Sequence, residues 1–231
     1  DIDSNKQALD NARAALKLKA KGLYSPFRII DCVEVSLNSS ITDGLKYERE
    51  AFLDCLKTPQ REGLVHAFFA ERKSVKVPEA GKAEPRPLSS IAVIGGGTMG
   101  SGITLAALKS GMHVTMVEQD EAGISKGIAN VEKVLDRDVT KGRLNSEQKV
   151  EIMDRYFPTT NFIDIADVDM VIEAVFEEME IKKQVFKKID KIAKKGAVLA
   201  SNTSYLNIDE IASATKRPRD VIGLHFFSPA N

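Results

Sequence analysis

The sequence has little cysteine, no excess of charge and no long apolar run. Its two cysteines, Cys32 and Cys55, form neither a disulfide framework nor a metal-ligand spacing, so we expect buried thiols, a reducing compartment and no metal site. Lysine and arginine total 33, as do aspartate and glutamate, which excludes a global charge that attracts nucleic acid or an anionic membrane. No segment is apolar enough to span a bilayer or resembles a signal peptide, so we expect a non-secreted protein without a membrane partner.

The composition that remains is typical of a globular protein. The 231 residues are 43% apolar and 29% charged, which allows one large or two small domains. The ends are unusual, because the sequence begins at Asp1 rather than methionine and stops at Asn231, shortly after an apolar stretch. We therefore expect the chain to be a portion of a longer protein.

The first 73 residues have the apolar spacing of helices and contain no glycine-rich loop. Apolar stripes predict helices over 5–21 and 44–57, and Thr58 followed by Pro59 is a typical start for a further helix. The segment FRIIDCVEVSL fits either a strand or a helix. Prolines and charges without periodicity then predict a linker. We expect a helical segment at 1–73, a linker at 74–89 and a second domain at 90–231.

In that second domain, short apolar strands alternate with helices. Strands are predicted at IAVIG, HVTMVE, DMVIEAV, AVLASN and VIGLHFF, and Asn145 with Gln148 predicts a capping box between the second and third of them. The helix that carries the lysines from Lys182 to Lys195 combines an apolar face with a solvated basic face. The alternation predicts an α/β fold, a Rossmann-type parallel sheet with helices on both faces.

A glycine-rich loop joins the first of these strands to its helix. It consists of Gly95, Gly96, Gly97, Thr98, Met99 and Gly100. Its glycines fit the dinucleotide pattern, in which they allow a tight turn, close approach of the pyrophosphate and close packing of helix on strand. Glu118 ends the next predicted strand, near the roughly 20-residue spacing expected of the carboxylate that binds the adenosine ribose. That carboxylate would repel a 2′-phosphate, so the loop predicts NAD rather than NADP.

Other interpretations of this loop stay open at this point. The glycines would also fit a turn in an unrelated α/β protein, or a site for FAD or another nucleotide, and Glu118 would also fit a surface carboxylate.

Four motifs resemble one family in the same order. IAVIGGGTMGSGI, VIEAVFEEMEIKKQVF, SNTSYLNIDEIA and GLHFFSPAN are similar to the NAD-binding domain of L-3-hydroxyacyl-CoA dehydrogenases, and most similar to the multifunctional β-oxidation enzymes. The likeness covers residues 88–231. The earlier stretch EREAFLDCLKTPQREGLVHAFFAERK resembles the last helices of an enoyl-CoA hydratase domain, which precedes the dehydrogenase in those enzymes.

The resemblance implies oxidation of an L-3-hydroxyacyl-CoA to a 3-ketoacyl-CoA, with hydride passing to NAD. It implies that His225 accepts the hydroxyl proton, a role that suits the pKa of imidazole, and that Ser204 hydrogen-bonds the reacting oxygen. It also implies cofactor contacts by Asn202, Glu177 and Lys182. Without the resemblance, His225 would be a structural histidine, Ser204 part of a turn, and both Glu177 and Lys182 ordinary charges on a helix surface.

The resemblance also shows what the sequence does not contain. Ser228 stands where single-function members carry asparagine, so a substrate contact there is in doubt. The glutamate that pairs with the family's histidine would lie beyond Asn231, and the hydratase's oxyanion-hole and glutamate segments are missing. Loss of an orienting carboxylate costs roughly 10⁴ in turnover in serine proteases. We therefore expect these residues to bind NAD but to be catalytically deficient.

The expected partner of the parent protein is an acyl-CoA, in the cytoplasm of a bacterium or in the peroxisome or mitochondrial matrix of a eukaryote. Helices in 1–73 with exposed apolar faces would favour self-association. Two alternatives remain open: another NAD(P)-dependent 3-hydroxyacid dehydrogenase, and a non-catalytic module whose helices dock a partner.

Overall fold

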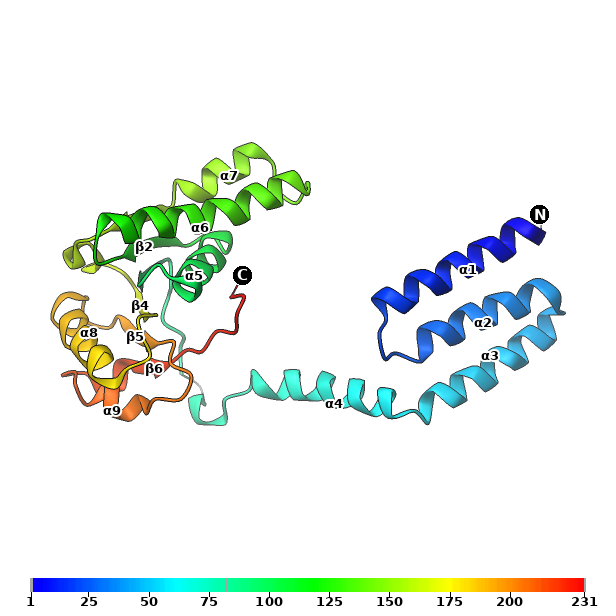
Figure 1. Cartoon of the computed structure of the whole chain (residues 1–231). Helices are drawn as coiled ribbons and strands as arrows, with labels where there is room; N and C mark the ends of the chain where they lie inside the picture. Colours follow the sequence, from blue (N-terminus) through cyan, green and yellow to red (C-terminus); the bar gives the residue numbers. More distant parts are fainter. Residues whose placement is uncertain (1, 82, 231) are drawn as a thin grey trace. The chain divides into compact units, whose positions relative to one another are not determined.

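The computed structural model describes residues 2–81 and 83–230 (Figure 1). The chain divides into two compact units, Asp1–Glu84 and Pro85–Asn231. Within the described residues, none of the helices has the length and apolar character needed to cross a bilayer.

The first unit is helical. Its elements are α1 (Ile2–Lys19), α2 (Ser25–Asn38), α3 (Ile41–Leu56), α4 (Pro59–Ser74) and a 3₁₀ turn at Pro78–Ala80. The segment left open between strand and helix is therefore helical, because Pro26 lies in the first turn of α2, where no backbone N–H is needed. Thr58 caps α4 as predicted, since its hydroxyl accepts a hydrogen bond from the Arg61 amide at 3.3 Å.

Few apolar side chains of this first unit are buried. The helices α1, α2 and α3 pack in sequence order, around Ala20, Ile30 and Ala51. Many larger apolar side chains of the unit remain exposed, including Ile29 and Phe69. Much of the apolar surface of these helices is therefore in contact with solvent in this structure.

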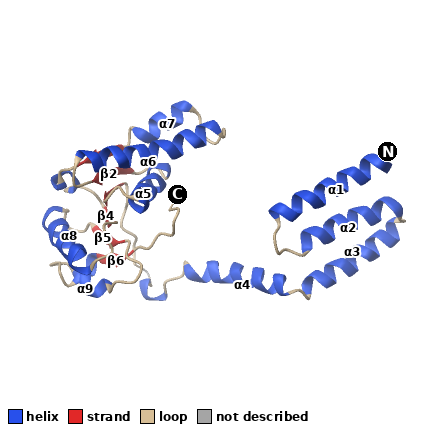
Figure 2. Ribbon diagram, in the orientation of Figure 1, coloured by secondary structure: helices blue, strands red, loops and turns tan. Residues whose placement is uncertain are grey.

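The second unit is a doubly wound α/β domain (Figure 2). Its strands are β1 (Ser90–Ile94), β2 (His113–Val117), β3 (Tyr156–Thr159), β4 (Met170–Glu173), β5 (Val198–Ser201) and β6 (Val221–Gly223). Its α-helices are α5 (Thr98–Lys109), α6 (Glu121–Thr140), α7 (Ser146–Met153), α8 (Met179–Ile192) and α9 (Ile208–Ala212). All strand pairs are parallel and run in the order β3-β2-β1-β4-β5-β6, which confirms the predicted Rossmann-type fold.

Two details of the predicted sheet are wrong. The edge strand β3 was not expected from the sequence, and it pairs with β2 alone. The last strand was expected to run through Phe227, but β6 ends at Gly223, so His225 lies in the loop that follows. The predicted capping box at the start of α7 is present: Asn145 and Gln148 bond each other's backbone amides.

Along the strands, alternate residues are buried on opposite faces of the sheet. Ile91 and Val93 of β1 pack with α5, α6 and α7, while Ala92 and Ile94 pack with α8 and α9. This alternation explains the continuous apolar run in β1, because both faces of a parallel sheet are covered by helices.

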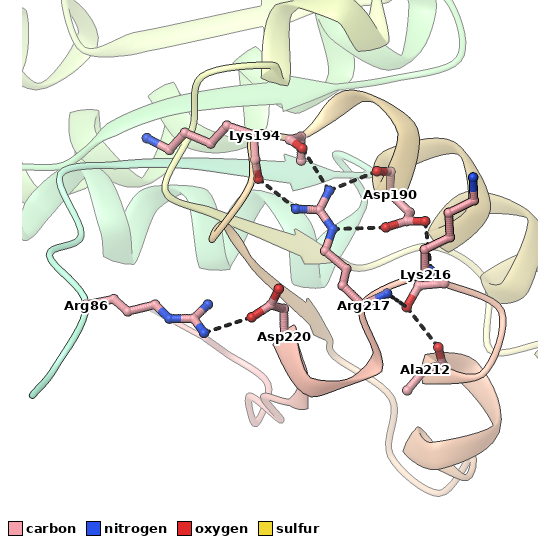
Figure 3. Close-up of polar contacts among 9 residues, drawn as sticks. Arg86, Asp190, Lys194, Ala212, Lys216, Arg217 and Asp220 are labelled. Carbon is pink, nitrogen blue, oxygen red and sulfur yellow. Dashed lines mark hydrogen bonds and ion pairs between the residues drawn. The ribbon is translucent and has the colours of Figure 1, made fainter. Parts of the chain in front are cut away.

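An arginine at the amino edge of the sheet fixes the end of α8. Arg217 donates to the carboxylate of Asp190 and to the carbonyls of Asp190, Ala193 and Lys194, at 2.7 to 2.9 Å (Figure 3). A cation at the C-terminal end of a helix satisfies its unpaired carbonyls and its negative dipole end. Nearby, Arg86 bonds Asp220, which attaches the segment before β1 to the same edge.

Asp169 fixes the start of β1 against β4. Its carboxylate accepts from the amides and hydroxyls of Ser89 and Ser90 and forms an ion pair with Lys194 at 2.7 Å. The hydrogen bond from Lys194 and those from the two serines outweigh burial and hold the pKa of Asp169 well below its usual range.

We predict that Asp169→Asn lowers the free energy of unfolding at neutral pH by about 1–3 kcal/mol, the scale of hydrogen bonds to a charged group. Because the folded-state pKa of Asp169 is depressed, its contribution is present above the unfolded pKa, about 4, and is lost as the pH falls below it. Denaturant unfolding should therefore separate variant and wild type at pH 7 but much less at acidic pH. Asp167→Asn, at an exposed position two residues earlier, is the matched control; an equal loss there would contradict the assignment.

Candidate functional site

The glycine-rich loop lies at the carboxyl edge of the sheet, between β1 and α5. Gly95 turns the chain with φ +99°, and a Cβ there would meet the Ala174 carbonyl oxygen at 2.9 Å. A Cβ on Gly100 would lie 1.7 Å from the Gly95 oxygen, so α5 crosses β1 at a distance that only glycine permits. This packing directs the first turn of α5 toward the point where the strand order reverses between β1 and β4.

Gly97 differs from these two glycines, because it is exposed and nothing lies within 4 Å of a Cβ built on it. It is the N-cap of α5, and within the described residues no side chain caps that helix. The loop therefore presents backbone amides not covered by a side chain, together with the positive end of a helix dipole. This is the arrangement that binds a pyrophosphate.

Glu118 immediately follows β2 and lies beside the same loop. Its carboxylate accepts from the Gly96 amide at 2.5 Å and from the Gln119 amide at 3.0 Å. A Cβ on Gly123 would come within 2.9 Å of this carboxylate, so the glycine leaves room for it. The structure thus places Glu118, the residue predicted to bind the adenosine ribose, beside the glycine-rich loop.

A pocket of about 620 Å³ adjoins both features. Its lining includes Gly95, Gly97, Thr98, Met99 and Glu118, together with residues of the loops after β3 and β4 and of α8. On the α8 side, the Lys188 ammonium stands 3.5 Å from the centre of the Phe162 ring. A glycine cradle, a carboxylate and a partly apolar wall fit a dinucleotide, and the residues that would hold NAD there are Thr98 and Met99, through their amides, and Glu118.

The loop after β5 carries Ser204 at the same edge of the sheet. Ser204 is exposed, and its amide donates to Glu177 at 2.7 Å, as does the Thr203 hydroxyl at 2.5 Å. Burial raises the pKa of Glu177, but hydrogen bonds from Thr203, Ser204 and Lys182 outweigh that effect and leave it below its usual value. Glu177 is therefore a carboxylate at neutral pH and holds the Ser204 backbone.

His225 follows β6 on the neighbouring loop. Ser201 and Gly223 are paired in the sheet, and the Asn202 side chain accepts from the Phe226 amide at 2.8 Å. This bond joins the loops that carry Ser204 and His225. The imidazole itself is exposed and meets the Phe227 ring edge-on, with 5.0 Å between ring centres.

Lys182 is where the structure departs most from the sequence-based interpretation. It is not a helix-surface charge: the residue is 0% exposed, and its ammonium pairs with Glu173 at 2.7 Å and Glu177 at 3.2 Å. Glu173, also 0% exposed, was not identified as a site residue. The available signal was a single acidic residue at the end of an otherwise apolar parallel strand.

The family described as "3-hydroxyacyl-CoA dehydrogenase, NAD binding domain" matches residues 90–231. The chain belongs to this family. Membership confirms the predicted NAD cofactor and the resemblance on which the dehydrogenase assignment was based.

Curated relatives match both units of the chain. It is 36% identical to the peroxisomal fatty acid beta-oxidation multifunctional protein AIM1 of Arabidopsis thaliana, over 96% of this chain and 31% of that protein. It is 38% identical to the peroxisomal bifunctional enzyme of Cavia porcellus, over 91% of this chain and 30% of that enzyme. The chain thus spans about a third of the length of these relatives.

Solved structures match nearly two thirds of the chain. FadB2 of M. tuberculosis is 38% identical with a TM-score of 0.62, over 63% of this chain and 51% of that chain. The 3-hydroxybutyryl-CoA dehydrogenase of Escherichia coli K12 is 35% identical with a TM-score of 0.61, over 63% and 31%.

The glycine geometry predicts opposite effects at two positions of the loop. Gly97→Ala should leave the melting temperature unchanged, because the new methyl meets no protein atom, but should weaken NADH binding by roughly tenfold or more, since it fills the space a pyrophosphate needs. Gly100→Ala should instead destabilise the fold itself. Thermal unfolding and calorimetric titration with NADH separate the two effects. Wild-type affinity in Gly97→Ala would show that the pyrophosphate binds elsewhere.

Proposed function

We propose that the natural protein containing this chain oxidises L-3-hydroxyacyl-CoA to 3-ketoacyl-CoA with NAD, and that this chain supplies the cofactor cradle, Ser204 and His225. The observation that carries the proposal is the convergence of three loops at one sheet edge. The Gly97 loop follows β1, Ser204 follows β5 and His225 follows β6, with the last two joined by Asn202. Family membership supports the same assignment.

In the proposed reaction, NAD held by the glycine-rich loop and Glu118 would supply the acceptor for the hydride at C3 of the substrate. The His225 imidazole accepts the proton of the C3 hydroxyl, so alcohol becomes ketone with no further oxidant. The Ser204 hydroxyl donates a hydrogen bond to the C3 oxygen of the substrate. This bond keeps the proton of the C3 hydroxyl directed toward His225. Asn202 and Glu177 hold the backbones of these two loops and thereby set the distance between the two groups.

His225 carries no orienting carboxylate in the part of the chain that the structure describes. An imidazolium that forms in the reaction is normally stabilised and held by such a group. We therefore propose that these 231 residues bind NAD but need other parts of the natural protein for turnover. The names of the relatives, a multifunctional protein and a bifunctional enzyme, support a second activity in the natural protein. Because the helical unit resembles the end of a hydratase domain, we propose that this activity is enoyl-CoA hydration.

Glu118 should select NADH over NADPH. Its carboxylate lies beside the phosphate loop, so the 2′-phosphate of NADPH would meet a like charge. Calorimetric titration of the chain should give clear binding of NADH and much weaker binding of NADPH. Glu118→Ala should narrow that difference, both by removing the like charge next to the 2′-phosphate of NADPH and by weakening NADH binding by roughly tenfold, the scale of one hydrogen bond to a charged group. Equal affinities in the wild type would argue against an NAD-specific site.

His225→Ala in the natural protein should lower the kcat of acetoacetyl-CoA reduction by roughly 10²–10⁴-fold, the usual contribution of a general acid–base group. Hydration of crotonyl-CoA should be unchanged, because it would use another site. His113→Ala is the control, since that exposed histidine begins β2 at the opposite edge of the sheet. Wild-type acetoacetyl-CoA reduction by His225→Ala would show that His225 takes no part in the reaction. Absence of crotonyl-CoA hydration in the wild-type protein would refute the second activity.

A further inference from the structure

Two opposite charges are buried together next to the proposed site. Glu173 and Lys182 are each 0% exposed, and the Lys182 Nζ donates to Glu173 Oε1 at 2.7 Å. Removing two ions from water costs several kcal/mol per ion, and apolar residues of similar volume often stabilise a fold equally well. Stability alone is therefore a weak explanation for this pair. Neither residue lines the pocket beside the glycine-rich loop.

The carboxylate of Glu173 joins the ends of two strands. It belongs to the last residue of β4, and its Oε1 also accepts from the Val175 amide at 2.7 Å. Its Oε2 accepts from the Ser201 hydroxyl, in the last residue of β5, at 2.6 Å. The Glu173 carboxylate is thus fixed by two donors besides Lys182 and provides a rigid acceptor for its ammonium.

Lys182 connects the fixed Glu173 carboxylate to the loop that carries Ser204. Its Nζ is 3.2 Å from Glu177 Oε2, while Glu177 Oε1 accepts from the Ser204 amide. Three links therefore lead from the end of β4 to the loop that carries Ser204. Glu177 is partly exposed, with 30% of its side chain accessible, and the buried ammonium adds to the hydrogen bonds from Thr203 and Ser204 that hold its carboxylate.

We infer that Glu173 is a positioning residue for the proposed dehydrogenation: acting through Lys182, it holds the Glu177 carboxylate and so sets the place of Ser204. The inference depends on the proposed function for its catalytic consequence, but the relay itself, the links from Glu173 through Lys182 and Glu177 to Ser204, consists of residues of this chain alone. Neutralising Glu173 leaves Lys182 with Glu177 as its one remaining acidic partner among the described residues. The ammonium then draws Glu177 toward itself and away from the Ser204 amide.

The relay can be tested without any cofactor. In Glu173→Gln, hydrogen exchange of the Ser204 amide, followed by NMR in the 231-residue chain, should accelerate by roughly tenfold, a local opening. The amide of Ala200, inside β5, should keep its wild-type rate. Glu178→Gln, at the exposed position next to Glu177, is the matched control and should change neither amide. Unchanged exchange at Ser204 in Glu173→Gln would overturn the inference.

The catalytic consequence is tested in the natural protein with a second set of variants. Glu173→Gln combined with Lys182→Met removes both buried charges, so its melting temperature should recover relative to Lys182→Met alone. Its kcat for acetoacetyl-CoA reduction should stay roughly 10–100-fold below wild type, the cost of a misplaced contact, with the KM for the acyl-CoA changed much less. A stable double variant with wild-type kcat would show that the pair only supports the fold.

A milder variant covers the case in which the double variant does not fold. Glu173→Asp keeps the charge but shortens the side chain, so it should lower kcat and leave the protein folded. Wild-type kcat in Glu173→Asp would also overturn the inference. A wild-type protein that does not reduce acetoacetyl-CoA would refute the proposed function and, with it, the catalytic role; a failure confined to the variants refutes the positioning role alone.

Discussion

The contact between Gly100 and Gly95 is the constraint on which the rest of the site depends. With a Cβ at position 100 the helix would collide with the Gly95 oxygen, so the absence of that atom sets how closely α5 approaches β1. The first turn of α5 consequently begins at the sheet edge where the strand order reverses between β1 and β4. That single distance decides whether unpaired amides face the ligand or another part of the protein. The exposed Gly97 then keeps the approach free of side-chain atoms.

The charges at this edge explain why backbone amides have to bind the phosphates. Glu118, Glu177 and Glu173 lie there, and the ammonium of Lys182 is already shared between two of these carboxylates. Of the described residues that line the pocket, Lys188 is the sole cation, and it stands over the Phe162 ring. A pyrophosphate therefore gains little from side-chain cations and depends on the dipole of α5. The same distribution of charge disfavours a further phosphate beside Glu118.

The parts of this structure set by local rules could be predicted from the sequence, and those set by distant partners could not. The glycine loop and the caps at Thr58 and Asn145 follow from residues a few positions apart. Strand β3 contains Pro158, which is tolerated there because the strand lies at an edge of the sheet. Lys182 lies in a lysine-rich helix, and its burial is explained by its ion pairs with Glu173 and Glu177, both outside that helix.

The early end of β6 shows how such a distant partner shapes the site. The Leu224 amide still bonds the Ser201 carbonyl, but the Phe226 amide bonds the Asn202 side chain instead of a backbone carbonyl. This replacement ends the backbone pairing of β6 with β5, so His225 lies outside the sheet. Its backbone is held by the hydrogen bonds of Leu224 on one side and Phe226 on the other. Its ring contacts Phe227 edge-on, and that contact alone does not fix which nitrogen carries the proton. The arrangement fixes the backbone of His225 more firmly than its imidazole, for which none of the described residues supplies a hydrogen bond.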